Sequence, residues 1–255
     1  MTNKRVIVAI ASVAIMSTLF LSNIYLYASD DGAEIKEFVR IQCETAELAD
    51  AVGNSSVLPE VYASVETRKL LDVDDIDAEN DAKNELLIRE ATYRYAVNNG
   101  FALSEEKIDA KFKDLINFIQ ETEEYSEIQS YYVENGQTFE DNIYDNYKFY
   151  ETEFVISEMY SFHQNRFANG EASFENYDYN TWEEYWDALQ RTALQEYKSS
   201  KDYAVLDNAI DQSLDIIESG EVEEISDMHM TVNESEEIDG TMVYDMLTYD
   251  HVGAI

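Results

Sequence analysis

Turn-forming residues are scarce along this chain, and that scarcity limits the folds that it can adopt. The 255 residues include 8 Gly and 1 Pro, which are too few for a β-sheet protein rich in tight turns. Hydrophobic residues make up 45% of the sequence, which is too rich for a disordered acidic chain. We therefore expect an all-α fold with a core of its own.

Apolar residues recur at helical spacing in successive segments between residues 30 and 220. Thr138 and Thr181 each stand three positions before an acidic residue, which is the spacing of a capping box. We predict one long helix from Thr138 to about Phe167, and an aromatic helix that Thr181 begins. A further stripe, confined to roughly a 100° arc of one helix, consists of Ile108, Phe112, Leu115, Ile116 and Ile119.

The N-terminus has the features of an export signal. Lys4 and Arg5 precede an apolar run over residues 6–28, which as a helix would span roughly 34 Å, enough to cross a bilayer. Basic residues on this flank place the rest of the chain outside the cytoplasm. A cleaved signal peptide and a retained signal-anchor both fit. We favour the anchor, because a cut after Ala28 would put Leu26, which is not small, at the minus-three position.

We expect a single transmembrane helix, then a multi-helix bundle and an acidic tail. The segments are a signal-anchor or signal peptide over 1–29, a helical lead over 30–77, a helical domain over 78–168, an aromatic helical extension over 169–220, and a partly disordered acidic tail over 221–255.

The charge is strongly one-sided. The chain has 54 Asp and Glu against 17 Lys and Arg, a net charge of -37, and no base follows Lys201. This excludes nucleic acid as a partner and disfavours anionic lipid headgroups. Weak binding of divalent cations along 72–81 or 218–227 is one further expectation. Another interpretation is that the acidity itself is an adaptation to high salt or to divalent-rich surroundings.

The sequence carries no complete catalytic or metal-ligand motif, so we predict neither an enzyme nor a cofactor. The histidines, His163, His229 and His251, do not pair at the spacing of a zinc site and are expected to have surface or packing roles. The single cysteine, Cys43, is expected to be a buried or half-buried residue, since acidic neighbours disfavour the thiolate.

Aromatic residues are concentrated in the middle of the chain, where 18 of the 32 Phe, Tyr and Trp lie between Tyr125 and Trp186. Burial against neighbouring helices explains many of them. The functional interpretation is an exposed surface that holds other polypeptides, because exposed aromatic patches mark interaction sites. The candidate client-binding residues are Tyr144, Phe149, Tyr160, Phe162, Trp182 and Trp186.

Residues 84–167 carry two linked motifs. The first is a helix that ends in Ala96-Val97-Asn98-Asn99-Gly100, followed by an apolar link and Ser104-Glu105-Glu106-Lys107-Ile108. The second is Asn135-Gly136-Gln137-Thr138-Phe139-Glu140-Asp141. Together they resemble the N-terminal chaperone domain of the SurA type, which also occurs in the foldase PrsA and is related to the C-terminal chaperone region of trigger factor. The resemblance covers about 85 residues.

The resemblance implies an exported helical module that holds non-native polypeptide through apolar contacts, without ATP. Many members of this family also carry a parvulin prolyl-isomerase domain. About 55 residues remain here after Ser200, and they lack the Gly-rich strands and paired histidines of that domain, so we expect no isomerase activity.

Two functions follow as hypotheses. The first is a membrane-tethered, extracytoplasmic chaperone-like protein with its C-terminal part outside the cytoplasm, or a secreted one if the N-terminal segment is cleaved. Its partners would be unfolded or secreted polypeptides. The alternative is a cell-surface interaction or assembly module that keeps the SurA-like fold and binds one dedicated partner.

Overall fold

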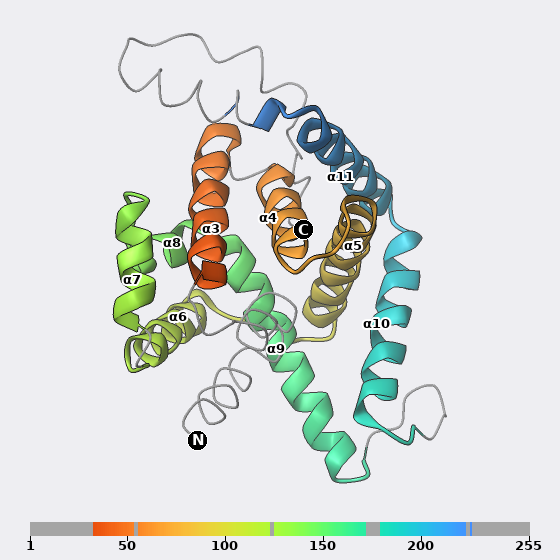
Figure 1. The fold of residues 1–255 in the computed structure, drawn as a ribbon. Coiled ribbons are helices and arrows are strands. Elements are labelled where there is room, and N and C mark those ends of the chain that lie inside the picture. The colour runs from red at the N-terminus through yellow and green to blue at the C-terminus, as the bar shows by residue number, and fades with distance from the viewer. Residues whose placement is uncertain (1–32, 54–55, 123–124, 172–178, 223–224, 226–255) are drawn as a thin grey trace. The chain divides into compact units, whose positions relative to one another are not determined.

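We describe the protein from a computed structural model. The structure describes residues 33–53, 56–122, 125–171, 179–222 and 225. Within these residues it consists of helices and contains no strand, so the all-α prediction is confirmed (Figure 1). The helices are α3 (Ala33–Val52), α4 (Leu58–Leu70), α5 (Asp75–Asn98), α6 (Glu105–Gln120), α7 (Tyr125–Glu134), α8 (Phe139–Asp145), α9 (Tyr147–Ala168), α10 (Trp182–Lys198) and α11 (Lys201–Ser219).

None of the described helices is both long and apolar enough to cross a bilayer. The predicted membrane segment at residues 6–28 lies outside the described residues, as does almost all of the acidic tail predicted for 221–255.

The chain divides into two compact units, which we describe separately. Unit 1 comprises the residues up to Lys36 together with Leu87–Ser200, and unit 2 comprises Glu37–Leu86 together with the residues from Lys201 onward. The division falls inside α5, so this helix contributes its first half to unit 2 and its second half to unit 1.

Unit 2 is built on aliphatic contacts, and within it α4 packs against α11. Pro59 occupies the first turn of α4, where its missing N–H costs no hydrogen bond. One core cluster joins Leu48, Val52 and Leu58, with Ile216 and Ile217 of α11 packed against it.

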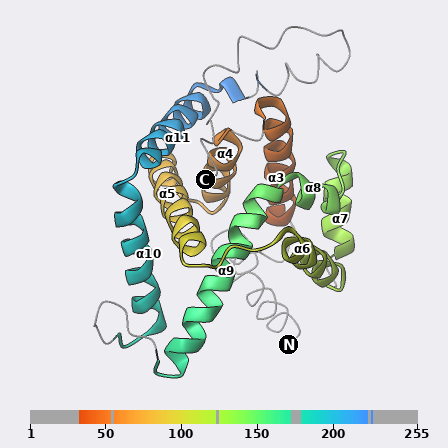
Figure 2. The same ribbon diagram turned by 180° about the vertical axis from the view of Figure 1, so that it is seen from behind.

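Unit 1 is built on aromatic contacts. Helices α6, α8 and α10 each pack against α9, and α7 packs against α8. Figures 1 and 2 show α9 and α10 lying side by side in both views. The predicted stripe of α6 is buried along its whole length, and Phe112 at its centre is 0% exposed. Its ring contacts Tyr144, Tyr147, Tyr150 and Phe154 at centroid distances of 5.1–5.8 Å.

The predicted helix starts at Thr138 and Thr181 are confirmed. The Thr138 hydroxyl accepts a hydrogen bond from the Asp141 amide at 3.1 Å, and the Thr181 hydroxyl accepts one from the Glu184 amide at 3.2 Å. In each case the side chain satisfies an amide that the first turn of a helix leaves unpaired.

The prediction of one long helix from Thr138 to about Phe167 is wrong, because the structure has two helices that meet at Asn146. The Asn146 side-chain amide donates to the Asn142 carbonyl at 2.8 Å. A side chain that bonds the backbone in this way competes with the helical pattern, and here Asn146 ends α8 and precedes α9.

Candidate functional site

A connected network of aromatic rings lies between α9, α10 and the link that follows α5, all within unit 1. Tyr185 of α10 is at its centre and is 2% exposed. Its ring lies 5.5 Å from Trp182, 5.7 Å from Phe167 and 5.8 Å from His163. Ala96, Val155, Met159 and Leu189 complete the buried cluster around it. We call this set of residues the α9–α10 aromatic network.

Three candidate residues meet on one side of this network. The Tyr160 ring lies edge-on to Trp182 at 4.8 Å and to Trp186 at 4.9 Å. The two indoles stack at 5.8 Å with 27° between their planes. The Trp182 indole N–H donates to the Tyr160 hydroxyl at 2.6 Å, so its polar atom is satisfied without facing water. All three side chains are half-buried.

Phe162 occupies another part of the same network and is 47% exposed. Its ring contacts Phe101 and His163, each at 5.3 Å. The guanidinium of Arg166 lies over the Phe162 ring, 5.7 Å from its centroid. His163 Nδ1 shares a hydrogen bond of 2.8 Å with the Tyr185 hydroxyl, which joins Phe162 to the centre of the network.

The remaining two candidates belong to other contacts of unit 1. Tyr144 of α8 is 49% exposed, and its ring stacks on Phe112 at 5.6 Å. Phe149 of α9 is half-buried against Tyr150, with the Arg89 guanidinium 5.0 Å from its ring centroid. The structure therefore brings together Tyr160, Trp182 and Trp186, joins Phe162 to them through other rings, and shows no such link for Tyr144 or Phe149.

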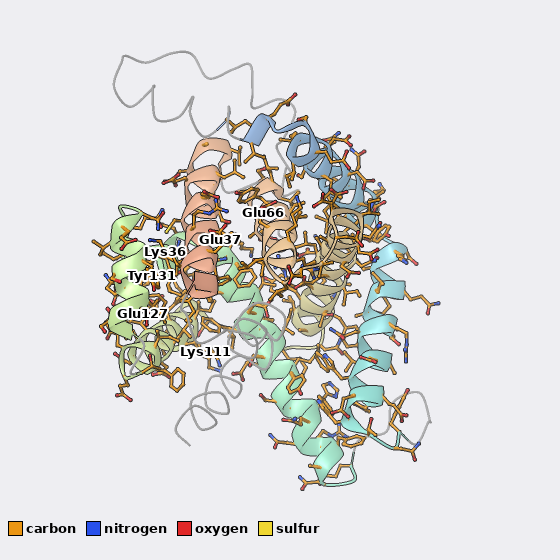
Figure 3. All side chains as sticks on the ribbon, viewed as in Figure 1. Lys36, Glu37, Glu66, Lys111, Glu127 and Tyr131 are labelled. Atoms are coloured by element: carbon orange, nitrogen blue, oxygen red, sulfur yellow. The ribbon has the colours of Figure 1, made fainter. Side chains whose placement is uncertain are left out.

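Basic side chains of unit 1 lie over aromatic faces at six places in the described residues. Figure 3 labels one of them, where the Lys36 ammonium lies 5.7 Å from the Tyr131 centroid while the Tyr131 hydroxyl donates to Glu127. The complete set pairs Lys36 with Tyr131, Arg89 with Phe149, Arg94 with Tyr197, Lys111 with Phe154, Lys148 with Tyr93 and Arg166 with Phe162. A cation in this position is attracted by the negative face of the ring.

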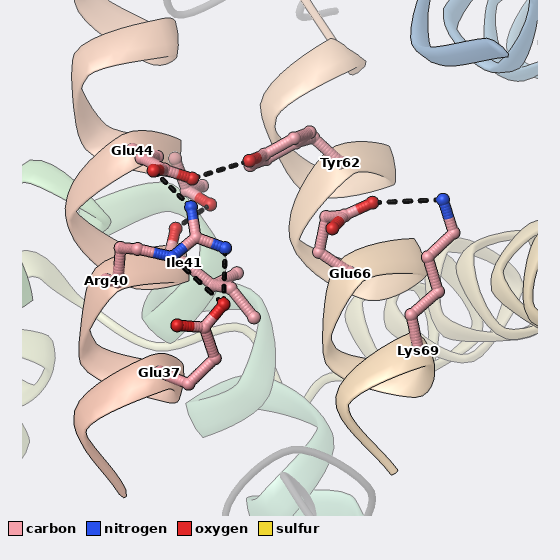
Figure 4. Close-up of polar contacts among 8 residues, drawn as sticks. Glu37, Arg40, Ile41, Glu44, Tyr62, Glu66 and Lys69 are labelled. Carbon is pink, nitrogen blue, oxygen red and sulfur yellow. Dashed lines mark hydrogen bonds and ion pairs between the residues drawn. The ribbon is translucent and has the colours of Figure 1, made fainter. Parts of the chain in front are cut away.

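In unit 2 the cations meet carboxylates. Figure 4 shows Arg40 between Glu37 and Glu44, and the Tyr62 hydroxyl donates to Glu44 at 2.6 Å. The hydrogen bond to Glu37 raises the pKa of Arg40, and burial together with the Glu44 bond raises the pKa of Tyr62. Every charge of this cluster has a partner and it includes no nucleophile, so we assign it a structural role.

The histidine and cysteine predictions have mixed outcomes. His163 packs inside the network, and burial followed by the charge of Arg166 lowers its pKa. His229 and His251 lie outside the described residues. Cys43 is buried, and burial with the nearby Glu47 and Glu44 raises its pKa to about 12, so the thiolate is disfavoured. The described side chains include no group of three or more potential ligands that could hold a metal ion.

Sequence reasoning assigned no functional part to Phe101, His163 or Tyr185, which connect the candidate residues. Phe101 directly follows the helix end at Gly100 and was part of an apolar link. Tyr185 was on the predicted apolar face of its helix, but its partner His163 lies 22 positions away. The one available signal was the concentration of aromatic residues itself.

Comparison of the chain with models of known protein families, with curated proteins and with solved structures finds no match. The SurA-type resemblance therefore stays a prediction from the motifs in residues 84–167.

Proposed function

We propose that this protein is a membrane-tethered, extracytoplasmic chaperone-like protein that holds non-native or secreted polypeptides without ATP and without isomerase activity. The observation that carries the proposal is the α9–α10 aromatic network, whose outer rings stay in contact with water. Phe162 is 47% exposed and the two indoles are half-buried, although Tyr185 beneath them is almost fully covered.

A passive holding surface needs apolar area that is rigid before it binds, because ordering side chains on binding costs free energy. The network meets this need. The Trp182 indole is fixed by its hydrogen bond to Tyr160, and His163 is fixed by its bond to Tyr185. Tyr and Trp rings also offer large contact area with few rotatable bonds, which suits them to binding varied segments.

The acidic surface supports the same proposal. A patch of partly exposed rings would promote self-association on a neutral protein, whereas a large net charge keeps the chain soluble. The net charge of -37 therefore allows the aromatic surface to remain accessible. Residues 6–28 and the basic residues before them support tethering and export, and the motifs in residues 84–167 support the chaperone class.

The experiment is suppression of aggregation by the purified full-length chain. A reduced, unfolded client protein is diluted into buffer with and without several-fold excess of the chain, and light scattering is recorded. We expect scattering to fall in proportion to the chain added and to be independent of ATP. A Phe162→Ala, Trp186→Ala double variant should lose most of the effect, whereas Tyr203→Ala, which alters an aromatic residue of unit 2, should retain it. Unchanged scattering with the wild-type chain would refute the proposal.

The second candidate is an interaction module with one dedicated partner, and one observation favours it. The outer rings are embedded in a single, hydrogen-bonded arrangement instead of a row of adaptable side chains. Crosslinking in the native cell separates the two functions. One predominant crosslinked protein would favour the dedicated module, and many unrelated polypeptides would favour the holding function.

A further inference from the structure

We propose that the edge of the α9–α10 aromatic network formed by Tyr160, Trp182 and Trp186 binds an arginine side chain of a bound polypeptide, with Glu183 and Asp187 as its counter-charges. This inference rests on the proposed function, since it specifies the chemistry of the segment that the network would hold. We call these five residues the arginine site.

The first argument is the distribution of cations over rings. Six Phe and Tyr rings in unit 1 already carry a Lys or Arg side chain of the same chain, at centroid distances of 5.0–5.8 Å. Indole is the ring that attracts a cation most strongly. Yet no cation from the described part of the chain lies over Trp182, Trp186 or Tyr160. The best acceptors of this interaction are therefore the ones left open.

The second argument is that two unbalanced carboxylates stand beside these rings. Glu183 precedes Trp186 by three residues on α10, so the two side chains are neighbours on the helix surface. Asp187 follows Glu183 by four residues, which places two like charges on one face, an arrangement that destabilises a helix. Both carboxylates are exposed, and neither forms an ion pair with any described residue.

The charge of Glu183 also reaches the ring cluster. Burial raises the pKa of the Tyr160 hydroxyl, the Trp182 hydrogen bond lowers it, and the charge of Glu183 raises it further. Glu183 therefore lies close enough to act on the ring that borders both indoles. A guanidinium placed over Trp186 would relieve the repulsion between Glu183 and Asp187 as well as gain the attraction of the ring.

The helix terminus does not oppose this arrangement. The positive end of α10 is compensated by its own cap, because the Glu184 carboxylate accepts from the Asn180 amide at 3.1 Å and Thr181 accepts from the Glu184 amide. Glu184 is thereby engaged, while Glu183 and Asp187 remain available. Arg191, one turn beyond Asp187, forms no ion pair with it among the described residues.

Arginine suits the site better than lysine, since its planar guanidinium can stack on an indole face and bond two carboxylates at once. The probe is the acetylated and amidated peptide Gly-Ser-Arg-Leu-Arg-Ser-Gly, and its control has citrulline in place of both arginines. Citrulline keeps the shape and hydrogen-bonding capacity of the side chain but carries no charge. The chain has only two tryptophans, and both lie in the site, so tryptophan emission reports on it directly.

The full-length chain is titrated with each peptide while tryptophan emission is recorded. We expect the arginine peptide to change the emission saturably and to bind about tenfold more tightly than the citrulline peptide, and its affinity to fall as salt is added. Glu183→Gln combined with Asp187→Asn should weaken binding of the arginine peptide about tenfold. The control Glu196→Gln removes an exposed carboxylate from the same helix and should leave the affinity unchanged.

Equal affinity for the two peptides would overturn the inference. So would an arginine affinity that falls equally in Glu196→Gln and in the double variant, because binding would then be a property of the general acidic surface. A circular-dichroism spectrum of each variant, identical to that of the wild type, verifies that α10 is intact.

Aggregation suppression by the wild-type chain, measured in parallel, separates this inference from the proposed function. Suppression without a preference for the arginine peptide would reject the arginine site and leave the holding function in place. A preference for the arginine peptide without suppression would reject the holding function, and the site would then serve a single cationic partner.

Discussion

The two units of this molecule use their few basic residues in different ways. In unit 2, Arg40, Arg68, Lys69 and Lys83 each meet a carboxylate at 3.7 Å or less. In unit 1, six basic side chains lie over aromatic rings, although several of these also meet an acid. In a chain of net charge -37, acids alone cannot explain this second pattern.

The difference shows what each unit contributes. An ion pair or charged network fixes two specific partners, and it suits a unit whose role is to keep one arrangement. An aromatic face accepts cations and apolar groups alike, so a unit lined with such faces can also accept them from another molecule. The comparison makes unit 1 the binding part of the molecule and unit 2 a supporting part.

The largest effect that we expect is the loss of the ring at the centre of α6. Phe112→Ala should lower the free energy of unfolding by about 3–5 kcal/mol, because the ring is fully buried and contacts four others. Urea denaturation followed by tryptophan emission measures this for unit 1, which holds both tryptophans. Tyr144→Ala, which removes an exposed ring from the same contact, should cost about 1 kcal/mol. Equal costs would mean that the aromatic core is not the main source of stability in unit 1.

The burial of Phe112 was predictable from the sequence, and the reason is local. Ile108, Phe112 and Ile119 recur at the helical period, so one face of α6 had to be covered whichever helix covers it. The capping residues Thr138 and Thr181 were predictable for the same reason, since their partners lie three residues away.

The contacts between distant segments were not predictable in this way. The periodicity placed Tyr185 on a buried face, but the hydrogen bond to His163 depends on how α10 packs against α9. The interruption at Asn146 was also missed, because the apolar pattern continues across it and only the side-chain bond to Asn142 reveals it. The candidate site could therefore be located in the sequence as an aromatic segment, but its division into separate contacts could not.

The next effect concerns the most enclosed ion pair of unit 2, between Arg68 and Glu85, whose side chains are 13% and 20% exposed. Arg68 also donates to the Ser64 carbonyl at 2.9 Å. Arg68→Met should cost about 2 kcal/mol, because it leaves the Glu85 charge partly buried beside Ser64 with no cation. Denaturation followed by circular dichroism measures the loss. Replacing both members with Met should recover at least half of it, and a double variant no more stable than the single one would show that the Arg68 side chain acts through packing alone.

Mild acid should affect the two units in opposite directions. In unit 1 the folded-state pKa of His163 is lowered by burial and Arg166, so its stabilising contribution is present above the ordinary pKa of 6.5 and is lost as the pH falls below it. In unit 2 the pKa of Glu47 is raised by burial and by Glu44 and Asp50, and that of Glu79 by burial and by Glu218. The folded unit 2 therefore takes up protons first and gains stability as the pH falls toward 4.5.

Hydrogen exchange measured by mass spectrometry at about pH 7 and about pH 5, with rates corrected for intrinsic exchange, tests this opposition. We expect peptides from α9 and α10 to lose protection at the lower pH and peptides from α4 and α11 to gain it. His163→Gln should abolish the change in unit 1, and Glu79→Gln should reduce the change in unit 2. A shift of the same sign in both units would contradict the assignment of these groups.

The smallest effect should come from the exposed ion pair of unit 1. Lys36 and Glu134 meet at 2.6 Å, but their side chains are 56% and 54% exposed, so water screens their attraction. Glu134→Gln should change the free energy of unfolding by less than about 0.5 kcal/mol, far less than the change expected for Arg68. Urea denaturation under identical conditions compares the two variants. If the Glu134 variant were as destabilised as the Arg68 variant, ion pairs would matter equally in both units, and the distinction between a unit held by charge pairs and a unit held by aromatic packing would have to be abandoned.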